Sequence, residues 1–327
     1  MIRSSVKQSA ARSALAAAAL SSLAVAPALA QQYPVKPVRV IVPFAPGGGS
    51  DITARQFSAK LTEALGQQFV VDNRGGAGGI IGMEMVAKAV PDGYVLMMMS
   101  GSFSATAATH KPPFDPIVNI VPVAEFGITP FVLAVHPSLP VKTTKELIAL
   151  AKAKPGQLVY ASSGVGGLTH LSTELFLSMT KTKMIHVPYK STGAAMTDLL
   201  SGQAPIIVGS LLPVVPHLST GKLRALGVTT AQRWYSLPNV PTIAETLPGY
   251  DVELWFGAMA PKGTPPEIIA RVNDAINKAL QAPDMKKNLE AQGLTATGGT
   301  PQKFGERINR EYARWVKVVQ EGNIKAE

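Results

Sequence analysis

Short runs rich in β-branched residues alternate with helix-length segments along most of this 327-residue chain. The run Val38–Val42 precedes a helical pattern over residues 51–65, and further strand candidates lie at residues 94–99 and 131–135. Strands separated by helix-length segments are typical of βαβ units, whose parallel central strands are apolar on both faces. The sequence therefore predicts an α/β fold with parallel sheets, and its length predicts two domains.

The same alternation continues toward the C-terminus. Further strands are predicted at residues 69–71, 160, 184–187, 206–208 and 226–228, and helices at residues 80–90, 144–154, 169–179, 265–281 and 301–320. Thr264 and Thr300 each precede a proline, a pattern typical of helix N-caps. The last helix carries one apolar stripe, which we expect to pack on a sheet: Phe304, Ile308, Tyr312, Trp315 and Val319.

The first thirty residues have the three parts of a secretory signal peptide. Basic residues precede an apolar run over residues 14–26, and Ala28-Leu29-Ala30 ends the segment. The run is shorter than the ~20 residues that a spanning helix needs. We therefore predict cleavage after Ala30 and export across the cytoplasmic membrane. The uncharged stretch 199–221 contains three prolines, which favour a buried strand with loops over a membrane span.

Composition excludes several classes of function. The chain has no cysteine, which rules out disulfides, thiol nucleophiles and cysteine-based metal sites. Its net charge is +10, but the basic residues are spread singly and aromatics make up 6%, so we expect no nucleic-acid partner. The five histidines are too scattered for metal spacing, and no P-loop or dinucleotide fingerprint is present. We expect neither a metal nor a cofactor.

Three glycine-rich loops lie between a predicted strand and a predicted helix, at residues 43–51, 73–79 and 162–170, and the turn 188–193 has the same design. Glycines let the backbone approach a ligand, and a helix N-terminus offers free N–H groups. A single such loop is more often ordinary architecture. Several together favour a ligand site, because these loops gather at the carboxyl ends of parallel strands.

Two residues of these loops have alternative interpretations. Asp51 could bind a cation, but at a helix start its carboxylate more often caps free N–H groups, which we favour. His170 lies in the first turn of a predicted helix, where the dipole keeps the imidazole neutral; a ligand contact and a packed structural histidine are equally compatible with this position.

Many ordered segments of the chain match one family: YPVKPVR at 33–39, IVPFAPGGGSD at 41–51, VDNRGGAGG at 71–79, PDGY at 91–94, YASSG at 160–164, HVPYK at 186–190, GKLRAL at 221–226, LPNVPT at 237–242 and APKGTP at 260–265. On these segments the chain resembles the substrate-binding proteins of tripartite tricarboxylate transporters, the Bug or TctC-like family of periplasmic receptors. The resemblance covers nearly all of residues 31–327.

The resemblance implies a two-lobed type II periplasmic binding protein fold (a Venus flytrap) that is not an enzyme. Lobe 1 would combine residues 31–128 and 251–327, and lobe 2 would be residues 129–250. The cleft between them would hold a small organic carboxylate, gripped by backbone amides, hydroxyls and waters. The ligand-binding residues would be Phe44, Ala45, Gly48, Gly49, Asp51, Ser162, Ser163, Gly164, Thr169, His170, Tyr189 and Ser191, with Ser100 and Ser102 as further candidates.

The function that we expect from this resemblance is capture of a carboxylate by a monomeric receptor, which delivers it to membrane subunits of the transporter. One alternative is a receptor whose loaded form contacts a signalling partner. Another is a periplasmic hydrolase using Ser163 and His170, although the sequence contains no G-x-S-x-G nucleophile elbow.

Overall fold

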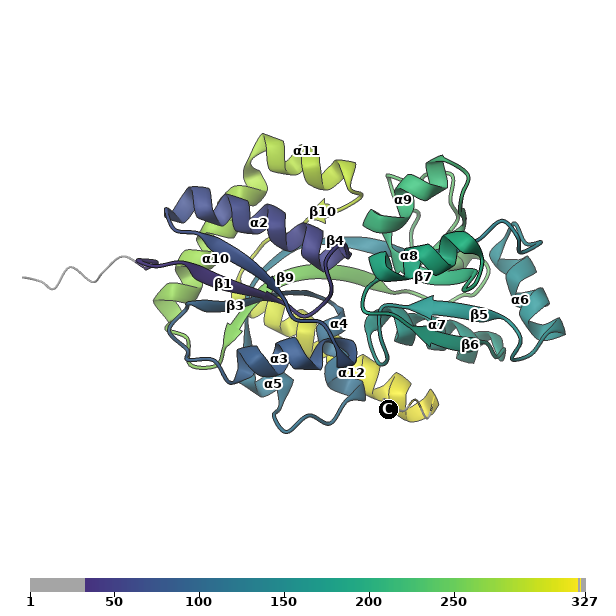
Figure 1. Ribbon diagram of the computed structural model, residues 1–327, viewed down its shortest axis with the longest axis horizontal. Helices are drawn as coiled ribbons and strands as arrows, with labels where there is room; N and C mark the ends of the chain where they lie inside the picture. The colour runs from purple at the N-terminus through teal and green to yellow at the C-terminus, as the bar shows by residue number, and fades with distance from the viewer. Residues whose placement is uncertain (1–32, 323, 325–327) are drawn as a thin grey trace, which may run out of the picture. The chain divides into compact units, whose positions relative to one another are not determined.

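Strand β4 (Ile120–Val135) joins the two halves of one hydrogen-bonded network of strands (Figure 1). The computed structural model describes residues 33–322 and Ile324, so the predicted signal peptide lies outside the described residues. From Lys36 onward the described residues form one compact unit. We use "sheet A" for residues 120–130 of β4 and the strands on that side, and "sheet B" for residues 131–135 and the strands on the other side.

Sheet A combines parallel and antiparallel pairs. Its other strands are β1 (Val38–Val42), β2 (Phe69–Asn73), β3 (Val95–Ser100), β9 (Glu253–Pro261) and the short β10 (Thr295–Ala296). Strand β1 pairs in parallel with β2 and β3, whereas β9 is antiparallel to β3 and β4. The prediction of parallel sheets is therefore wrong for β4, and β9, which was not predicted as a strand, is antiparallel as well. The chain passes from sheet A to sheet B along β4 and returns to sheet A just before β9. The two strands therefore run in opposite directions.

Sheet B has the same mixed character. Its other strands are β5 (Val159–Ser162), β6 (Ile185–Pro188), β7 (Ile206–Ser210) and β8 (Arg224–Val228). Strand β5 pairs in parallel with β6 and β7, and β4 is antiparallel to β7 and β8. Every strand predicted from the sequence is present with small differences at its ends, except that β4 was predicted only over residues 131–135 and begins at Ile120.

Helices cover both sheets (Figure 1). With sheet A lie α2 (Gly49–Leu65), α3 (Ile80–Ala87), α4 (Ser102–Thr109), α5 (Pro116–Asn119), α10 (Pro266–Gln281), α11 (Pro283–Ala291) and α12 (Pro301–Gly322), and with sheet B lie α6 (Thr144–Ala153), α7 (Leu168–Thr180), α8 (Thr192–Ser201) and α9 (Leu211–Ser219). Two 3₁₀ turns, Ala77–Gly79 and Ile243–Glu245, complete the set. In Figure 1, α2 lies on one side of sheet A and α3 with α5 on the other.

Local signals explain several helix ends. The Thr143 hydroxyl accepts the Glu146 N–H at the start of α6, and the Ser191 hydroxyl accepts the Ala194 N–H at the start of α8. Thr300 accepts the Lys303 N–H and caps α12, as predicted. Thr264 does not cap α10, because its hydroxyl donates to the Pro261 carbonyl and the helix begins later, at Pro266.

The C-terminal helix packs as its apolar stripe predicts. Phe304, Ile308 and Trp315 are buried, and α12 contacts α4, β4 and also α7 of sheet B. Six of the described helices and strands were not predicted, namely α4, α5, α9, α11, β9 and β10, and α8 was implied only by the turn that precedes it. The uncharged stretch 199–221 contains strand β7 as expected, but its second half is helix α9 with Pro216 inside.

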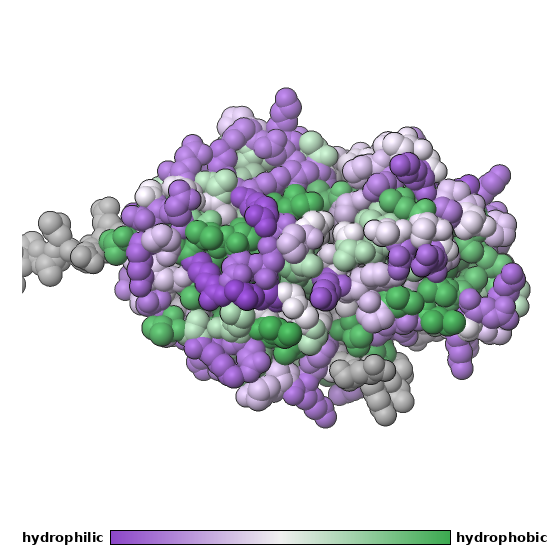
Figure 2. Space-filling view, viewed as in Figure 1, coloured by the Kyte–Doolittle hydropathy of each residue, from purple (hydrophilic) through white to green (hydrophobic). Residues whose placement is uncertain are grey.

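Within residues 33–322 and Ile324, no helix is both long and apolar enough to cross a membrane. On the face drawn in Figure 2, hydrophilic residues cover much of the surface and the apolar residues lie in separate patches. The large exposed apolar side chains, such as Val90, Val118 and Tyr235, come from different elements. Scattered apolar residues of this kind are normal on a protein surface.

Thr229 bonds both segments that cross between the sheets. Its hydroxyl accepts the Phe131 N–H at 2.8 Å and donates to the Val252 carbonyl at 2.7 Å. The backbone of Thr229 also pairs with both segments, donating to Phe131 and accepting from Val252. One buried threonine thus ties the end of β8 to the outgoing strand β4 and to the returning strand before β9.

Candidate ligand-binding cavity

A cavity with an empty volume of about 350 Å³ lies where sheet A and sheet B meet. Its lining comes from both sides and consists of Phe44, Gly48, Gly49, Ser50, Ser100, Ser102, Phe131, Ser163, Thr169, Ser191, Thr192, Ser210, Leu254 and Phe256. That volume includes space open to solvent at the mouth of the cavity.

Five helices begin at this cavity. The lining includes residues from the N-termini of α2, α4, α7, α8 and α9, represented by Gly49, Ser102, Thr169, Thr192 and Ser210. The N-caps of α2, α7 and α9 make no side-chain hydrogen bond to their helices. Their first N–H groups are therefore not capped by these side chains, and the positive ends of the helix dipoles converge on one space.

No charged side chain lines the cavity among the described residues. Eight lining residues carry hydroxyls, and the remaining side chains are apolar: Phe44, Phe131, Leu254 and Phe256. Helix N-termini and hydroxyls bind anions by hydrogen bonding, and the aromatic rings suit a hydrocarbon portion. The arrangement suits a small anion with an apolar portion and offers no group that would act as a nucleophile paired with a base.

Eight residues singled out by the sequence lie in this lining: Phe44, Gly48, Gly49, Ser100, Ser102, Ser163, Thr169 and Ser191. Sequence reasoning missed Ser50, Thr192 and Ser210, which the rule of hydroxyls at strand-to-helix turns could have found. It also missed Phe131, Leu254 and Phe256. These lie inside strands, where an apolar residue gives no signal that distinguishes a ligand contact from core packing.

Asp51 lies just outside the lining and fixes the first loop. Its carboxylate accepts the Gly47 N–H and the Asn73 amide, both at 3.0 Å, and pairs with Arg55 at 3.0 Å. Burial alone would raise the pKa of Asp51, but the bonds from Arg55, Gly47 and Asn73 together lower it. The expected capping differs in detail, because Asp51 accepts a loop N–H rather than an N–H of its own helix.

Four more predicted residues lie outside the lining. Ala45 belongs to the first loop, where its backbone lies close to Gly75. The Ser162 hydroxyl is buried against His186 Nε2 at 2.6 Å, and Tyr189 donates its hydroxyl to Asp198. Gly164 faces Gly78 across the two sheets, since a Cβ there would lie 3.3 Å from the Gly78 Cα.

His170 also lies outside the lining and has a structural environment. Its Nδ1 accepts the Gly166 N–H at 3.0 Å, and its ring stacks on His186 with centroids 4.0 Å apart. Burial and then the neighbouring His186 lower the pKa of His170 to about 3, and burial lowers the pKa of His186 to about 4. Both rings are therefore neutral at physiological pH.

The pairing of Ser163 with His170 that a hydrolase would need is not formed. The Ser163 hydroxyl bonds the Thr169 hydroxyl at 2.8 Å instead. The neighbouring Ser162 does contact a histidine, His186, but it is fully buried and cannot meet a substrate. The geometry supports binding and gives no base for nucleophilic attack at Ser163.

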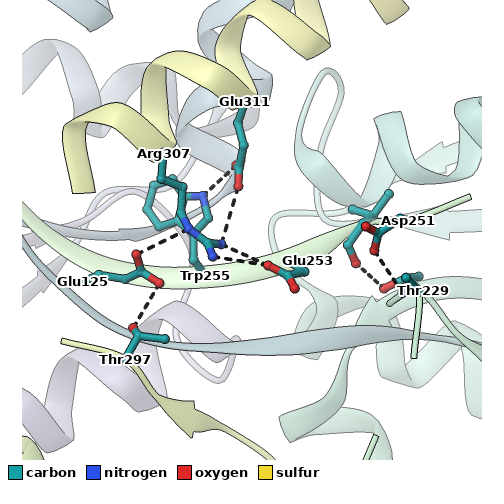
Figure 3. Close-up of polar contacts among 10 residues, drawn as sticks. Glu125, Thr229, Asp251, Glu253, Trp255, Thr297, Arg307 and Glu311 are labelled. Atoms are coloured by element: carbon teal, nitrogen blue, oxygen red, sulfur yellow. Dashed lines mark hydrogen bonds and ion pairs between the residues drawn. The ribbon is translucent and has the colours of Figure 1, made fainter. Parts of the chain in front are cut away.

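A half-buried ionic cluster lies behind the cavity wall formed by β9 (Figure 3). Arg307 of α12 is within 3.4 Å of Glu125, 3.2 Å of Glu253 and 3.7 Å of Glu311, so three carboxylates share one guanidinium. Glu311 also accepts the Trp255 indole N–H at 2.6 Å. Successive strand residues point to opposite faces, so β9 presents Leu254 and Phe256 to the cavity and Trp255 to this cluster.

Burial raises the pKa of two of these carboxyls. For Glu125 the nearby Arg307 and the Thr297 hydroxyl offset part of the effect. For Glu311 burial raises the pKa to about 7, against the opposing effects of Trp255 and Arg307. Burial therefore keeps the Glu311 carboxyl protonated to a higher pH than an ordinary glutamate, although Arg307 and Arg314 lie nearby.

Glu311→Gln tests this charge state. Below the ordinary carboxyl pKa of 4.5 the folded and unfolded proteins both hold the proton, but from there to about 7 only the folded protein keeps it. Rising pH therefore favours the unfolded wild-type chain. The glutamine carbonyl still accepts the Trp255 N–H and does not titrate. We expect the variant to gain at least about 1 kcal/mol relative to wild type between pH 5 and pH 8.

Urea unfolding at pH 5, 6, 7 and 8 measures this difference. Glu306→Gln, which removes an exposed carboxylate from the same helix, is the matched control and should keep the wild-type pH profile. The groups that surround Glu311 are Glu125, Glu253, Arg307 and Arg314. Parallel profiles for wild type and Glu311→Gln would contradict a buried proton at Glu311.

Comparison with known proteins identifies the family. The family model described as "Tripartite tricarboxylate transporter family receptor" matches residues 53–324. Protein BugT of Bordetella pertussis is 40% identical over 304 residues, which covers 92% of this chain and 93% of BugT.

Solved structures agree with this assignment. A protein of R. palustris solved with adipate is 38% identical, with a TM-score of 0.86 over 90% of this chain and 99% of that one. MatC from Rhodopseudomonas palustris, solved with malate, is 32% identical, with a TM-score of 0.84 over 88% of this chain and 100% of MatC. The chain has the two-lobed α/β fold of periplasmic binding proteins, belongs to the receptor family of tripartite tricarboxylate transporters, and is a periplasmic solute-binding receptor rather than an enzyme.

Proposed function

We propose that the cavity binds a small aliphatic carboxylate, of the size of adipate or malate. The observation that carries this proposal is the meeting of five helix N-termini at a cavity lined by no charged side chain among the described residues. Such a site attracts a carboxylate through partial charges and N–H groups. Adipate and malate, which two of the similar proteins hold, are ligands of this kind.

The proposed contacts divide the lining between polar and apolar roles. Seven predicted lining residues (Gly48, Gly49, Ser100, Ser102, Ser163, Thr169 and Ser191), with Ser50, Thr192 and Ser210, would bind carboxylate oxygens directly or through water. Phe44, Phe131, Leu254 and Phe256 would contact the carbon chain. Asp51, Ser162, Gly164, His170 and Tyr189 would act indirectly, by holding the loops that carry the ligand contacts.

We infer that two lobes close on the ligand. Lobe 1 would comprise residues 31–128 and 251–327, and lobe 2 residues 129–250, so that the crossings lie next to Phe131 and Val252. Phe131 and Val252 are both hydrogen-bonded to Thr229, so the two lobes would rotate about this threonine. Because the cavity draws on both sheets, a ligand would bind the closed form more tightly and shift the population toward it. The loaded monomer, exported after removal of residues 1–30, would deliver the acid to its transporter.

Thermal unfolding with a panel of acids tests the ligand class. A ligand present at about 100 times its Kd adds about 2.7 kcal/mol to the free energy of unfolding, so the Tm should rise by several degrees with a true ligand. The panel includes adipate, malate, citrate and benzoate. Adipamide, which has the shape of adipate but no charge, is the matched control and should leave the Tm unchanged. A Tm that no acid raises would refute the carboxylate proposal.

A further inference from the structure

The backbone of the first glycine-rich loop lies against the first turn of helix α8, which packs with sheet B. A Cβ placed on Gly193, in the first turn of α8, would lie 2.7 Å from the Gly47 carbonyl oxygen and 3.0 Å from the Gly47 carbonyl carbon. Next to it, a Cβ on Gly48 would lie 3.2 Å from the Ser191 Cβ. Two backbones therefore touch at this point, beside the cavity that Gly48, Ser191 and Thr192 line.

The backbone conformation at position 193 does not require glycine. It lies within α8, and its φ is outside the left-handed region that favours glycine. Alanine is the better helix former at such a position. Other glycines at the contact between the sheets are different: Gly78 and Gly166 also face the opposite side closely, but both have positive φ, so their substitution would strain the backbone as well.

A series of polar contacts fixes the position of Gly47. Its N–H donates to Asp51, and Asn73 and Arg55 hold that carboxylate in turn. The Gly47 carbonyl oxygen then lies against the first turn of α8, where the helix dipole is positive and favours an oxygen. The loop cannot retreat without breaking these bonds, so a side chain at Gly193 would have to be accommodated by separating the two sheets.

We propose that Gly193 is a positioning residue for closure: its missing side chain allows the Gly47–Gly48 peptide to dock on α8 and complete the cavity. This inference rests on the proposed function, because closure matters only if a ligand is enclosed. One substitution should therefore change two measurable properties in opposite directions. Gly193→Ala should stabilise α8 and at the same time weaken ligand binding, because the closed form no longer fits together.

The experiment compares wild type, Gly193→Ala and Thr197→Ala. Thr197 is exposed on the same helix, so its replacement by alanine also raises helix propensity but does not touch the cavity. With adipate as the probe, calorimetry should give a Kd at least tenfold higher for Gly193→Ala and an unchanged Kd for Thr197→Ala. The ligand-free Tm of both variants should equal or exceed that of wild type. A merely structural role for Gly193 would lower the Tm together with the affinity.

A distance measurement reports closure separately from affinity. Because the chain has no cysteine, spin labels can be attached through Lys88→Cys, directly after α3, and Lys152→Cys in α6, one on each side of the cavity. We expect wild type to show the short distance between the two labels that marks the closed form. Gly193→Ala should not show it, whether or not adipate is present. An equal short-distance population in both proteins, or an unchanged Kd, overturns the inference. If wild type binds no acid of the panel, the ligand proposal fails, while the ligand-free distances still test Gly193.

Discussion

Replacing Arg307 by methionine is expected to lower the free energy of unfolding by about 3–5 kcal/mol at pH 7. The arginine is the cation common to Glu125, Glu253 and Glu311, and Glu125 is only 7% exposed. Methionine keeps much of the side-chain volume but leaves these carboxylates without their partner. The loss should be smaller at pH 5, because the carboxyls then take up protons instead of remaining buried as anions.

Arg233→Met is the matched control for this experiment. Arg233 also forms a close carboxylate pair, with Glu245 at 2.8 Å, but its side chain is 50% exposed. Solvent-exposed ion pairs contribute little to stability, so this variant should unfold close to wild type. Urea unfolding of both variants at the two pH values gives the comparison. If Arg307→Met behaved like Arg233→Met, the cluster behind β9 would have no role in holding the fold.

Gly48→Leu is expected to weaken ligand binding by about 100-fold or more, which corresponds to roughly 2.7 kcal/mol. Gly48 lines the cavity and has a φ of −83°, so a larger residue fits the backbone there. Its side chain would occupy the cavity and press on Ser191, whose Cβ would be 3.2 Å away. The Tm should change little, because the added atoms enter a space that the protein does not fill.

A graded series separates this steric effect from damage to the fold. Gly48→Ala adds a single carbon and should weaken binding by less than Gly48→Leu, with both variants unfolding near the wild-type temperature. Calorimetric titration with the acid that raises the wild-type Tm most gives the affinities. Wild-type affinity in Gly48→Leu would remove the first loop from the binding site.

Much of the fold was predictable because its signals are local. The β-branched run Val38–Val42 and the glycines that follow it indicate a strand and a strand-to-helix turn with no knowledge of distant residues. The same holds for the loops after β5 and β6. Since these turns gather at one edge of the sheets, the rule that ligands bind there indicated the loops, whereas the individual site residues came from the family resemblance.

The missed parts depend on contacts between distant segments. Strand β9 contains Gly257, which weakens a strand pattern, yet glycine is needed there because a Cβ would lie 2.4 Å from the Phe304 ring of α12. The cluster of Glu125 and Arg307 joins residues far apart in the chain. No spacing rule could have predicted it, and the same applies to the apolar cavity residues Phe131 and Phe256.

The uncharged lining has a consequence for how the protein would give up its cargo. An acid held by peptide dipoles and hydroxyls forms no ion pair with the protein, so no ion pair has to break when the acid leaves. The main barrier to release is then the separation of the two sheets. Transport by such a carrier would be paced by that opening, and the membrane partner could unload it by favouring the open form alone, without supplying a competing charge.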